Sequence, residues 1–449
     1  MAVALLAFHA AWVPRWGWVM AIFPCCLIPL IYLPTLAMRW SVGLVLGLAM
    51  YGPHLHFFWT LFGPAAAVLW LILAFWPALF LVVGGEFQLR LPTGLLVIAL
   101  PILWTGLEYF RSELYFLRFS WLTPGLALAW GEAPNLLSRL GVFGTGFLLF
   151  TAGTSLTLLN GRPRWLMTGG IAVLAALLSR AGPQPEPTHL LRVAGAQIES
   201  ATVDEIPGIL DRVVATHPDA DLIVLPEYSL DAPPSPELRQ WCSTQRRHVI
   251  VGGREPLAGG GFRNTAWVLD PRGETVFSQV KSVPIQFFDD GEPATSQALW
   301  DSPWGALGIA ICYDLSYTRV IDSLARLGAQ GLIIPTMDSV GWGRYQHQLH
   351  ARIAPARAAE YGIPIVRCAS SGISQLVNSR GGVDTSAPFS DEILVFAGNI
   401  RLGPRASLPA DRTFAPLCTA ASVAGVLGIA FFPLLARRHP SQKATAPPL

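Results

Sequence analysis

Three reactive side chains each follow an apolar, strand-like stretch of the chain. Glu227 comes after Leu-Ile-Val-Leu-Pro, Lys281 after Glu-Thr-Val-Phe-Ser-Gln-Val, and Cys312 after Leu-Gly-Ile-Ala-Ile. Because active sites of α/β sheets form where strands end, we expect these side chains to lie together. A carboxylate, an ammonium group and a thiol can perform covalent acyl chemistry. The carboxylate takes the thiol proton and later activates the acceptor nucleophile, the thiolate attacks an acyl carbon, and the ammonium group stabilises the oxyanion.

The choice of basic residues supports a special role for Lys281. Of the 31 Lys and Arg residues, only Lys281 and Lys443 are lysines, so arginine serves almost everywhere that a positive charge is needed. A lysine kept inside a folded domain offers a compact point charge whose pKa can shift, which arginine does not. The backbone N–H of Tyr313, directly after the thiol, is the expected second donor to the oxyanion.

The elements that must position these side chains indicate an α/β domain at 190–398. Near-continuous apolar strands that alternate with helices are typical of buried sheets. No Cys-x-x-Cys or His-x-x-x-His pattern indicates a metal site. We expect strands at 190–197, 221–226, 248–253, 265–270, 307–311, 331–335 and 363–367, and helices at 205–216, 235–245, 318–328 and 344–361.

Composition divides the chain into a membrane half and a water-soluble half. Hydrophobic residues make up 52% and charged residues only 13%, whereas soluble domains carry about 25% charged residues. Residues 1–189 contain neither Asp nor Lys, and the net charge of +2 offers no basic face for nucleic acid. We expect eight apolar segments, the first of them short, at 2–13, 18–36, 41–59, 64–84, 93–109, 141–159, 164–180 and 415–435.

Arginine placement sets the expected orientation in the membrane. Loops that contain Arg39, Arg90, and the pair Arg162 and Arg164 fall inside together with the N-terminus. The loop at 110–140 falls outside and breaks the trend because it also carries arginine. The soluble half then lies outside, between the seventh and eighth helices, which is the periplasmic face in a bacterium.

The segment at 110–140 alternates aromatic residues with Arg and Glu. This pattern is typical of an amphipathic arm at the level of the lipid headgroups, which could admit lipid to a site. An aromatic belt that flanks two helices is the alternative. The expected organisation is membrane residues 1–182, a Pro-rich linker at 183–189, the soluble domain, a linker at 399–413, a last span at 414–436 and a cytoplasmic tail at 437–449.

The reactive residues and the membrane half both resemble known proteins. Leu-Pro-Glu-Tyr, then Lys281, then Ile-Cys-Tyr-Asp resemble the Glu–Lys–Cys triad of the nitrilase superfamily. The membrane half resembles bacterial apolipoprotein N-acyltransferases in Pro-Ile-Leu-Trp-Thr-Gly-Leu-Glu-Tyr-Phe-Arg (101–111), Phe-Ser-Trp-Leu-Thr-Pro-Gly (119–125) and Leu-Gly-Val-Phe-Gly-Thr-Gly-Phe-Leu (140–148). The order of spans and soluble domain fits as well, so the resemblance covers essentially the whole chain.

The resemblance implies a membrane α-helical bundle of about eight transmembrane helices, joined to a nitrilase-like α-β-β-α sandwich. It implies ping-pong acyl transfer without metal or cofactor. A phospholipid, usually phosphatidylethanolamine, acylates the cysteine, and the α-amino group of a diacylglyceryl-cysteine lipoprotein then takes the chain as an amide. It also implies a multi-pass protein of the bacterial inner membrane with a periplasmic catalytic domain, which we expect to be a monomer.

Two positions depart from the family pattern. The family has Glu two residues after the cysteine, whereas this chain has Asp314, which can bind the amine or orient the loop. The segment after the lysine, Leu-Val-Pro-Phe-Gly-Glu in the family, reads Ser-Val-Pro-Ile-Gln-Phe-Phe-Asp-Asp-Gly-Glu here. We favour Glu292 as the secondary carboxylate, because a glycine turn precedes it, with Asp289 and Asp290 as rivals.

Other residues near the expected site admit more than one interpretation. Trp342 is expected either to line the acyl channel or to pack at the surface, and His347 and His350 are interpreted as structural because the triad already supplies a base. Three alternative functions remain. They are a membrane-anchored nitrilase-type amidase in which water resolves the thioester, an acyltransferase for a different amine, and a non-catalytic lipid-binding protein.

Overall fold

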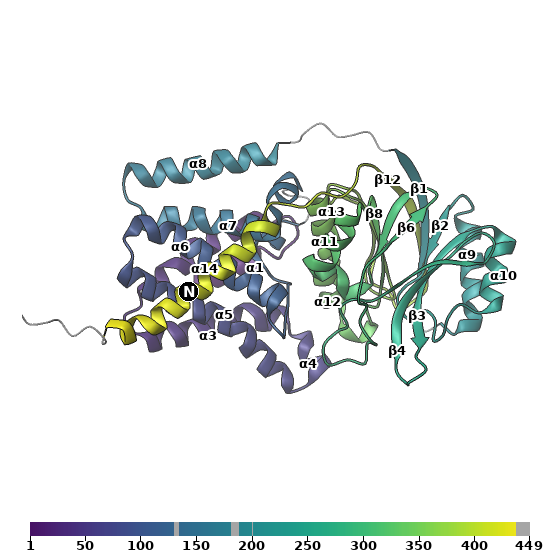
Figure 1. The fold of residues 1–449 in the computed structure, drawn as a ribbon, viewed down its shortest axis with the longest axis horizontal. Helices are drawn as coiled ribbons and strands as arrows, with labels where there is room; N and C mark the ends of the chain where they lie inside the picture. The colour runs from purple at the N-terminus through teal and green to yellow at the C-terminus, as the bar shows by residue number, and fades with distance from the viewer. Residues whose placement is uncertain (130–133, 181–187, 200, 437–449) are drawn as a thin grey trace, which may run out of the picture.

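The computed structural model describes residues 1–129, 134–180, 188–199 and 201–436. Most of the expected linker at 183–189 and the whole tail at 437–449 lie outside the described residues. A helical bundle occupies one end of the molecule and an α/β domain the other, and the last helix, α14 (Asp411–Ala436), returns from the domain along the bundle (Figure 1). The chain therefore has the two-part organisation that its composition predicts.

The N-terminal half is helical throughout. Within the described ranges, four helices are long and apolar enough to cross a membrane: Ala65–Arg90, Thr93–Leu114, Asn135–Leu158 and Asp411–Ile429. Their apolar composition and length are those expected of a membrane helical bundle. The helices of this half are α1 (Ala2–Ala10), α2 (Ile22–Leu27), α3 (Leu36–His54), α4 (Phe57–Phe62), α5 (Ala65–Arg90), α6 (Thr93–Tyr109), α7 (Pro134–Leu158) and α8 (Arg162–Ser179).

The apolar segment at 18–36 differs from a single continuous span. It forms a 3₁₀ turn at Gly17–Ala21, the short helix α2, and a second 3₁₀ turn at Ile28–Tyr32. Pro24 and Pro29 interrupt the segment, and proline removes a helical hydrogen bond and clashes with the preceding turn. Hydropathy detects the apolar character of this segment but not its broken backbone.

The segment at 110–140 lies between the bundle and the α/β domain. It contains a π turn (Phe110–Leu114) and a 3₁₀ turn (Pro124–Leu128), and most of its described residues are buried, although Phe116 is 76% exposed. Trp121 donates from Nε1 to Ser316 Oγ of the domain at 3.1 Å, and Ser120 Oγ donates to the Ser316 carbonyl at 2.9 Å. These contacts connect the segment to the domain, and its position relative to lipid headgroups stays a prediction.

Two six-stranded sheets face each other in the α/β domain. The first has the order β12-β1-β2-β3-β4-β5, and the second has the order β11-β10-β9-β8-β7-β6. In each sheet three neighbouring strands are parallel, β1-β2-β3 and β7-β8-β9. The strands are β1 (His189–Gln197), β2 (Leu222–Val224), β3 (His248–Pro256), β4 (Phe262–Leu269), β5 (Thr275–Val280), β6 (Leu299–Ser302), β7 (Gly305–Ile309), β8 (Gly331–Thr336), β9 (Ile365–Ala369), β10 (Ser374–Val377), β11 (Val383–Ala387) and β12 (Leu394–Leu402).

Apolar side chains fill the space between the sheets, and helices cover both outer faces. Val193 and Val224 of the first sheet pack with Ile309 and Ile333 of the second in one buried cluster. The helices α9 (Ile206–Thr216) and α10 (Pro236–Gln245) cover the first sheet. The helices α11 (Thr318–Leu327), α12 (Arg344–Ala351) and α13 (Ile353–Tyr361) lie between the second sheet and the bundle (Figure 1). The expected α-β-β-α sandwich is confirmed.

The apolar core continues from the domain into the bundle. Leu332 and Ile365 of the second sheet belong to the same buried cluster as Phe80 and Phe150 of the bundle. At about 25 cal/mol per Å² of buried apolar surface, such a continuous core favours a fixed arrangement of the two parts. The α/β domain is therefore held against the helices.

Candidate active site

Glu227 lies just beyond the end of β2, with its carboxylate buried between the sheets. Its Oε1 accepts hydrogen bonds from Asn264 Nδ2 at 2.6 Å and from Lys281 Nζ at 2.8 Å. Its Oε2 accepts from the backbone N–H of Met337 at 2.7 Å. Burial raises the pKa of Glu227, while the Lys281 charge opposes that rise. A carboxylate with a raised pKa is a better proton acceptor than an exposed glutamate.

Lys281 follows β5 and sits between two carboxylates. Its Nζ lies 2.8 Å from Glu227 Oε1 and 2.7 Å from Asp290 Oδ2, and its side chain is 1% exposed. Burial by itself lowers the pKa of Lys281, but Glu227, Asp290 and the Cys312 sulfur outweigh it and raise the pKa well above its ordinary value. Lys281 is therefore a fixed positive charge in the site.

Of the three acids considered as the secondary carboxylate, Asp290 lies beside Lys281, whereas the preferred Glu292 does not enter the site. Asp290 is buried and accepts hydrogen bonds from the Tyr228 hydroxyl at 2.5 Å and from the backbone N–H of Ile285 at 2.6 Å, whereas Glu292 is exposed. Gly291 separates the two acids with a positive φ of 81° and packs tightly on β4. This turn leaves Asp290 inside and Glu292 in water, and the other rival, Asp289, is exposed too.

Cys312 begins the 3₁₀ turn Cys312–Ser316 after β7. Its φ of +51° is in the left-handed region, which is uncommon for a residue other than glycine and clusters at functional sites. The thiol is 1% exposed and its Sγ lies 3.6 Å from the Met337 carbonyl oxygen. Burial, and next the charge of Glu227, raise the pKa of Cys312 well above its ordinary value, so the resting sulfur is a thiol.

Asp314 ties the cysteine loop to the lysine loop. Its carboxylate accepts hydrogen bonds from the backbone N–H groups of Ile311 at 3.0 Å, Ser282 at 3.0 Å and Val283 at 2.7 Å. Burial raises its pKa to about 6 despite the Lys281 charge and these donors. Of the two roles expected for this aspartate, the contacts correspond to orienting the loop.

Two residues of the cluster were not expected from the sequence. Asn264 of β4 donates to both Glu227 and Asp290, and its carbonyl accepts from the Lys281 N–H at 2.8 Å. Met337, after β8, contacts Glu227 through its N–H and Cys312 through its C=O. Asn264 could have been noticed in the sequence, because it is a polar residue directly before an expected apolar strand. Met337 acts through its backbone, so its residue type carries no signal.

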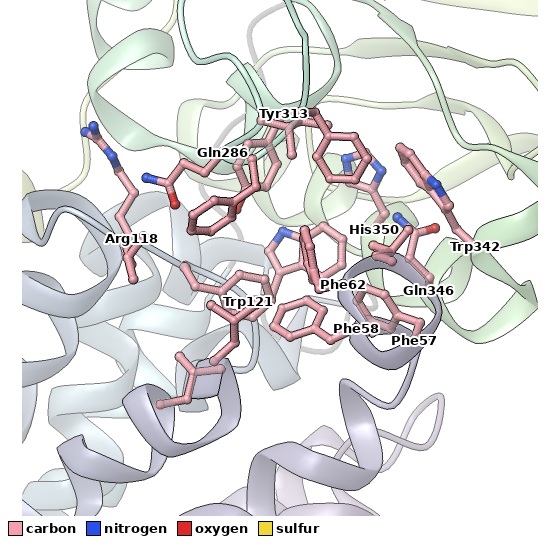
Figure 2. A pocket seen from close by; sticks show the side chains of 18 of the residues that line it. Phe57, Phe58, Phe62, Arg118, Trp121, Gln286, Tyr313, Trp342, Gln346 and His350 are labelled. Carbon is pink, nitrogen blue, oxygen red and sulfur yellow. The ribbon is translucent and has the colours of Figure 1, made fainter. Parts of the chain in front are cut away.

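An apolar cavity lined by Cys312 extends to the helical bundle. Figure 2 shows Phe57, Phe58 and Trp121 on its bundle side. The cavity encloses about 870 Å³, counting its open mouth. The expected support residues Tyr313 and Trp342 both line it, as does His350, which the sequence analysis interpreted as structural. The rest of the wall comes from α4, α5, residues 117–121, the loop 285–288 and α12: Phe57, Phe58, Leu61, Phe62, Leu69, Ile72, Leu73, Leu117, Arg118, Phe119, Trp121, Ile285, Gln286, Phe287, Phe288 and Gln346.

Comparisons with known proteins agree with this architecture. Residues 190–399 match the family model for carbon-nitrogen hydrolases. The apolipoprotein N-acyltransferase of Geobacter metallireducens is 25% identical over 434 residues, which is 81% of each chain. That of Bordetella bronchiseptica is 26% identical over 359 residues, which is 64% of each chain. The resemblance to apolipoprotein N-acyltransferases is thus confirmed along most of the chain.

Solved structures also resemble the α/β domain. The carbon-nitrogen hydrolase from Helicobacter pylori G27 is 18% identical, with a TM-score of 0.41 over 56% of this chain and 96% of that chain. Nit3 of Saccharomyces cerevisiae, a member of branch 10 of the nitrilase superfamily, is 20% identical, with a TM-score of 0.40 over 50% of this chain and 93% of that chain.

Proposed function

We propose that the protein transfers an acyl chain from a phospholipid, through a thioester on Cys312, to the N-terminal amine of diacylglyceryl-cysteine lipoproteins. The names of the similar chains from Geobacter and Bordetella support lipoprotein N-acylation in general. The finer steps rest on the geometry of the site. Glu227, Lys281 and Cys312 are assigned as the catalytic triad, with Asp290 and Asp314 in support.

The cavity is the observation that carries this proposal. It joins a buried thiol to apolar side chains of α4 and α5, so its interior matches an acyl chain better than a small water-soluble amide. An amidase with a mere membrane anchor has no need for a wall that its helices supply. Arg118 and Gln286 lie together at one side of the cavity (Figure 2) and would meet the polar part of a phospholipid such as phosphatidylethanolamine.

The first half-reaction forms the thioester. Glu227 accepts the thiol proton while Sγ of Cys312 attacks the ester carbonyl carbon, which forms the C–S bond. Lys281 and the backbone N–H of Tyr313 stabilise the oxyanion. When the C–O bond breaks, the lysophospholipid oxygen leaves with the proton from Glu227. The carboxylate is restored, and the acyl chain remains in the cavity.

The second half-reaction forms the amide. The amine nitrogen attacks the thioester carbon, the C–S bond breaks, and the electron pair returns to sulfur next to Lys281. The thiolate regains a proton, so that thioester and amine become amide and thiol. Asp290 and Asp314 hold the lysine loop in place through both steps, because they contact Lys281, Ser282 and Val283.

The membrane arrangement is part of the proposal. We assign the protein to the bacterial inner membrane as a multi-pass monomer with a periplasmic catalytic domain. Apolar side chains exposed on the helices support contact with lipid, among them Leu95, Leu166, Val173, Leu417 and Leu427. The cavity then opens at the level where a lipid-borne donor and a lipid-borne acceptor both reside.

Intact-protein mass spectrometry tests the function. Purified protein is incubated with phosphatidylethanolamine, and a diacylated lipopeptide with a free N-terminus is then added. An acyl adduct that persists in water and leaves with the lipopeptide supports the proposal. An adduct that decays in water regardless indicates a hydrolase. Transfer to simple amines but not to the lipopeptide indicates another acceptor, and no adduct contradicts the phospholipid donor.

A further inference from the structure

His350 of α12 presents a polar ring in the mostly apolar wall of the cavity, whose other polar side chains include Arg118, Gln286 and Gln346. It lines the same cavity as Cys312, and its ring lies parallel to that of Trp121 at 5.2 Å between centroids (Figure 2). Buried polar groups carry a desolvation cost unless they are satisfied or used. The mechanism described above uses neither ring nitrogen of His350.

One ring nitrogen is fixed by a buried carboxylate. Nδ1 of His350 lies 2.7 Å from Asp338 Oδ1, and Asp338 is held in turn by Arg367 Nη2 at 2.5 Å. Burial tends to raise the pKa of Asp338, but Arg367 and His350 outweigh it and lower that pKa, so Asp338 is a carboxylate. Nδ1 also lies 3.1 Å from Arg367 Nη2, which can only donate, but its 2.7 Å contact with the Asp338 carboxylate is the shorter one. We therefore assign the hydrogen to Nδ1 and the lone pair to Nε2. Within the described part of the chain, Nε2 has no hydrogen-bond partner.

The groups around His350 keep its ring neutral. Burial lowers its pKa, and the nearby charge of Arg367 on β9 lowers it further, while Asp338 opposes them. The uncharged ring of Trp121 stacks on the His350 ring from the bundle side. A neutral imidazole with a lone pair in a cavity is a proton acceptor.

Three hydrogen-bond donors hold Glu227 in the orientation in which it serves the thiol in the proposed first half-reaction. Both of its oxygens accept hydrogen bonds, from Asn264, Lys281 and Met337. The two half-reactions also need different proton transfers: the first removes a proton from Cys312, and the second removes one from a lipid-borne nitrogen. The cavity wall that carries His350 also contains Trp121, next to the bundle through which such an acceptor would arrive.

We infer that His350, oriented by Asp338, accepts the proton of the amine in the second half-reaction. This inference rests on the proposed function. The nitrogen bonds to the acyl carbon and passes its surplus proton to Nε2, and the C–S bond breaks with its electron pair on sulfur. The imidazolium then returns the proton to Sγ of Cys312. Glu227 serves the thiol, and His350 serves the amine.

The test separates the two half-reactions in one protein. Wild-type enzyme is first acylated with phosphatidylethanolamine and then treated with a diacylated lipopeptide, which tests the proposed function alone. His350→Gln is expected to acylate normally but to transfer to the lipopeptide about 100-fold more slowly at neutral pH. Transfer to hydroxylamine is expected to change little, because the surplus proton on the nitrogen of this weakly basic nucleophile is acidic enough to pass to water without His350. Raising the pH should restore part of the lipopeptide rate.

His347→Gln is the matched control. His347 is buried on the same helix, where its Nε2 lies 2.9 Å from the Ser339 carbonyl oxygen, but it does not line the cavity. The His347→Gln variant should leave the rates of both half-reactions nearly unchanged. His350→Ala with added imidazole provides a second variant, in which the lipopeptide rate should recover. Equal slowing with both nucleophiles, no slowing with either, or loss of acylation in both His350 variants would overturn the inference.

Discussion

Two buried ion clusters in this protein have similar composition and different surroundings. The catalytic cluster contains Glu227, Lys281, Asp290 and Cys312, and a cavity reaches its thiol. The second cluster, here called the docking cluster, consists of Asp322, Arg357, Glu360, Tyr361 and Arg412. It lies where α11 and α13 meet the bundle and α14.

The clusters differ in the residue that supplies the positive charge and in the further hydrogen bonds that this residue makes. Arginine supplies the positive charge in the docking cluster, where Arg357 also donates to the carbonyls of Leu315 at 3.1 Å and Ser316 at 2.8 Å. Glu360 accepts from the N–H of Val142 in α7 at 2.7 Å, which ties the domain to the bundle. Planar, multiply bonded arginine suits a fixed joint, whereas a lysine point charge suits a charge that appears only during reaction. Both clusters bury acids, but only one of them includes a nucleophile.

The largest expected effect is the loss of the nucleophile. Cys312→Ala removes the atom that forms the thioester, so no acyl adduct should appear by intact-protein mass spectrometry. The docking cluster is untouched, so the unfolding midpoint in detergent should stay close to that of the wild type. A normal adduct on the variant would show that another residue is the nucleophile.

Loss of charge in the docking cluster should affect stability instead. Glu360→Gln leaves Arg357 without its buried carboxylate partner, which costs about 3–5 kcal/mol for a buried ion pair, while Arg412 keeps Asp322 and Asp411. Denaturant unfolding in detergent, followed by tryptophan fluorescence, measures the change. The acylation rate per folded molecule should remain near that of the wild type. A stable variant with a damaged acylation rate would contradict the separation of roles.

Exchanging lysine for arginine in one cluster, and arginine for lysine in the other, tests this comparison. Lys281→Arg should slow acylation about 100- to 1000-fold, because a guanidinium fork does not fit between Glu227 and Asp290 and misplaces the oxyanion donor. Arg357→Lys should instead lower stability, since lysine does not reproduce the donors to Leu315 and Ser316. Single-turnover acylation and unfolding are measured on both variants. Equal behaviour of the two would remove the distinction between the clusters.

The raised pKa of Glu227 predicts the pH dependence of acylation. The base works only when ionised, so the rate falls about tenfold per pH unit below its pKa. Because burial raises that pKa, the fall begins at a higher pH than an exposed glutamate would give. Rapid-quench mass spectrometry between mildly acidic and neutral pH records the profile. A rate independent of pH across this range would exclude Glu227 as the base.

The smallest effect is expected for an ion pair in water. Arg272 contacts Asp270 at 2.8 Å, but its side chain is 72% exposed. Arg272→Ala should therefore change stability by less than about 1 kcal/mol, and acylation should not change. It serves as the reference for the Glu360 and Arg357 variants in the same unfolding assay. A large loss of stability in Arg272→Ala would mean that the unfolding assay does not distinguish exposed ion pairs from buried ones.

The sequence predicts the parts of the site that follow apolar strands. Glu227, Lys281 and Cys312 come together because their strands end at one edge of the facing sheets. All seven expected strands are present, whereas β6 and the strands from β10 to β12 were not expected. Those strands are short, or pair antiparallel at sheet edges, and lack a long apolar run.

Other parts of the site depend on packing that a linear pattern does not record. Asp289, Asp290 and Glu292 are chemically equivalent in the sequence, and only the turn at Gly291 and its contact with β4 decide which acid enters. The expected helix at 344–361 divides into α12 and α13, and its pattern does not show that His350 faces a cavity. That cavity joins residues from α4 to α12, which are far apart in the chain.

The backbone of Met337 bridges Glu227 and Cys312, with 2.7 Å from its N–H to Glu227 Oε2 and 3.6 Å from its carbonyl oxygen to Cys312 Sγ. Every amino acid except proline supplies the same two groups. The side chain at this position can therefore vary during evolution. Replacing it with alanine should leave the two backbone contacts, and with them the activity, unchanged. Loop length, rather than residue identity, is what selection has to preserve between β8 and Trp342.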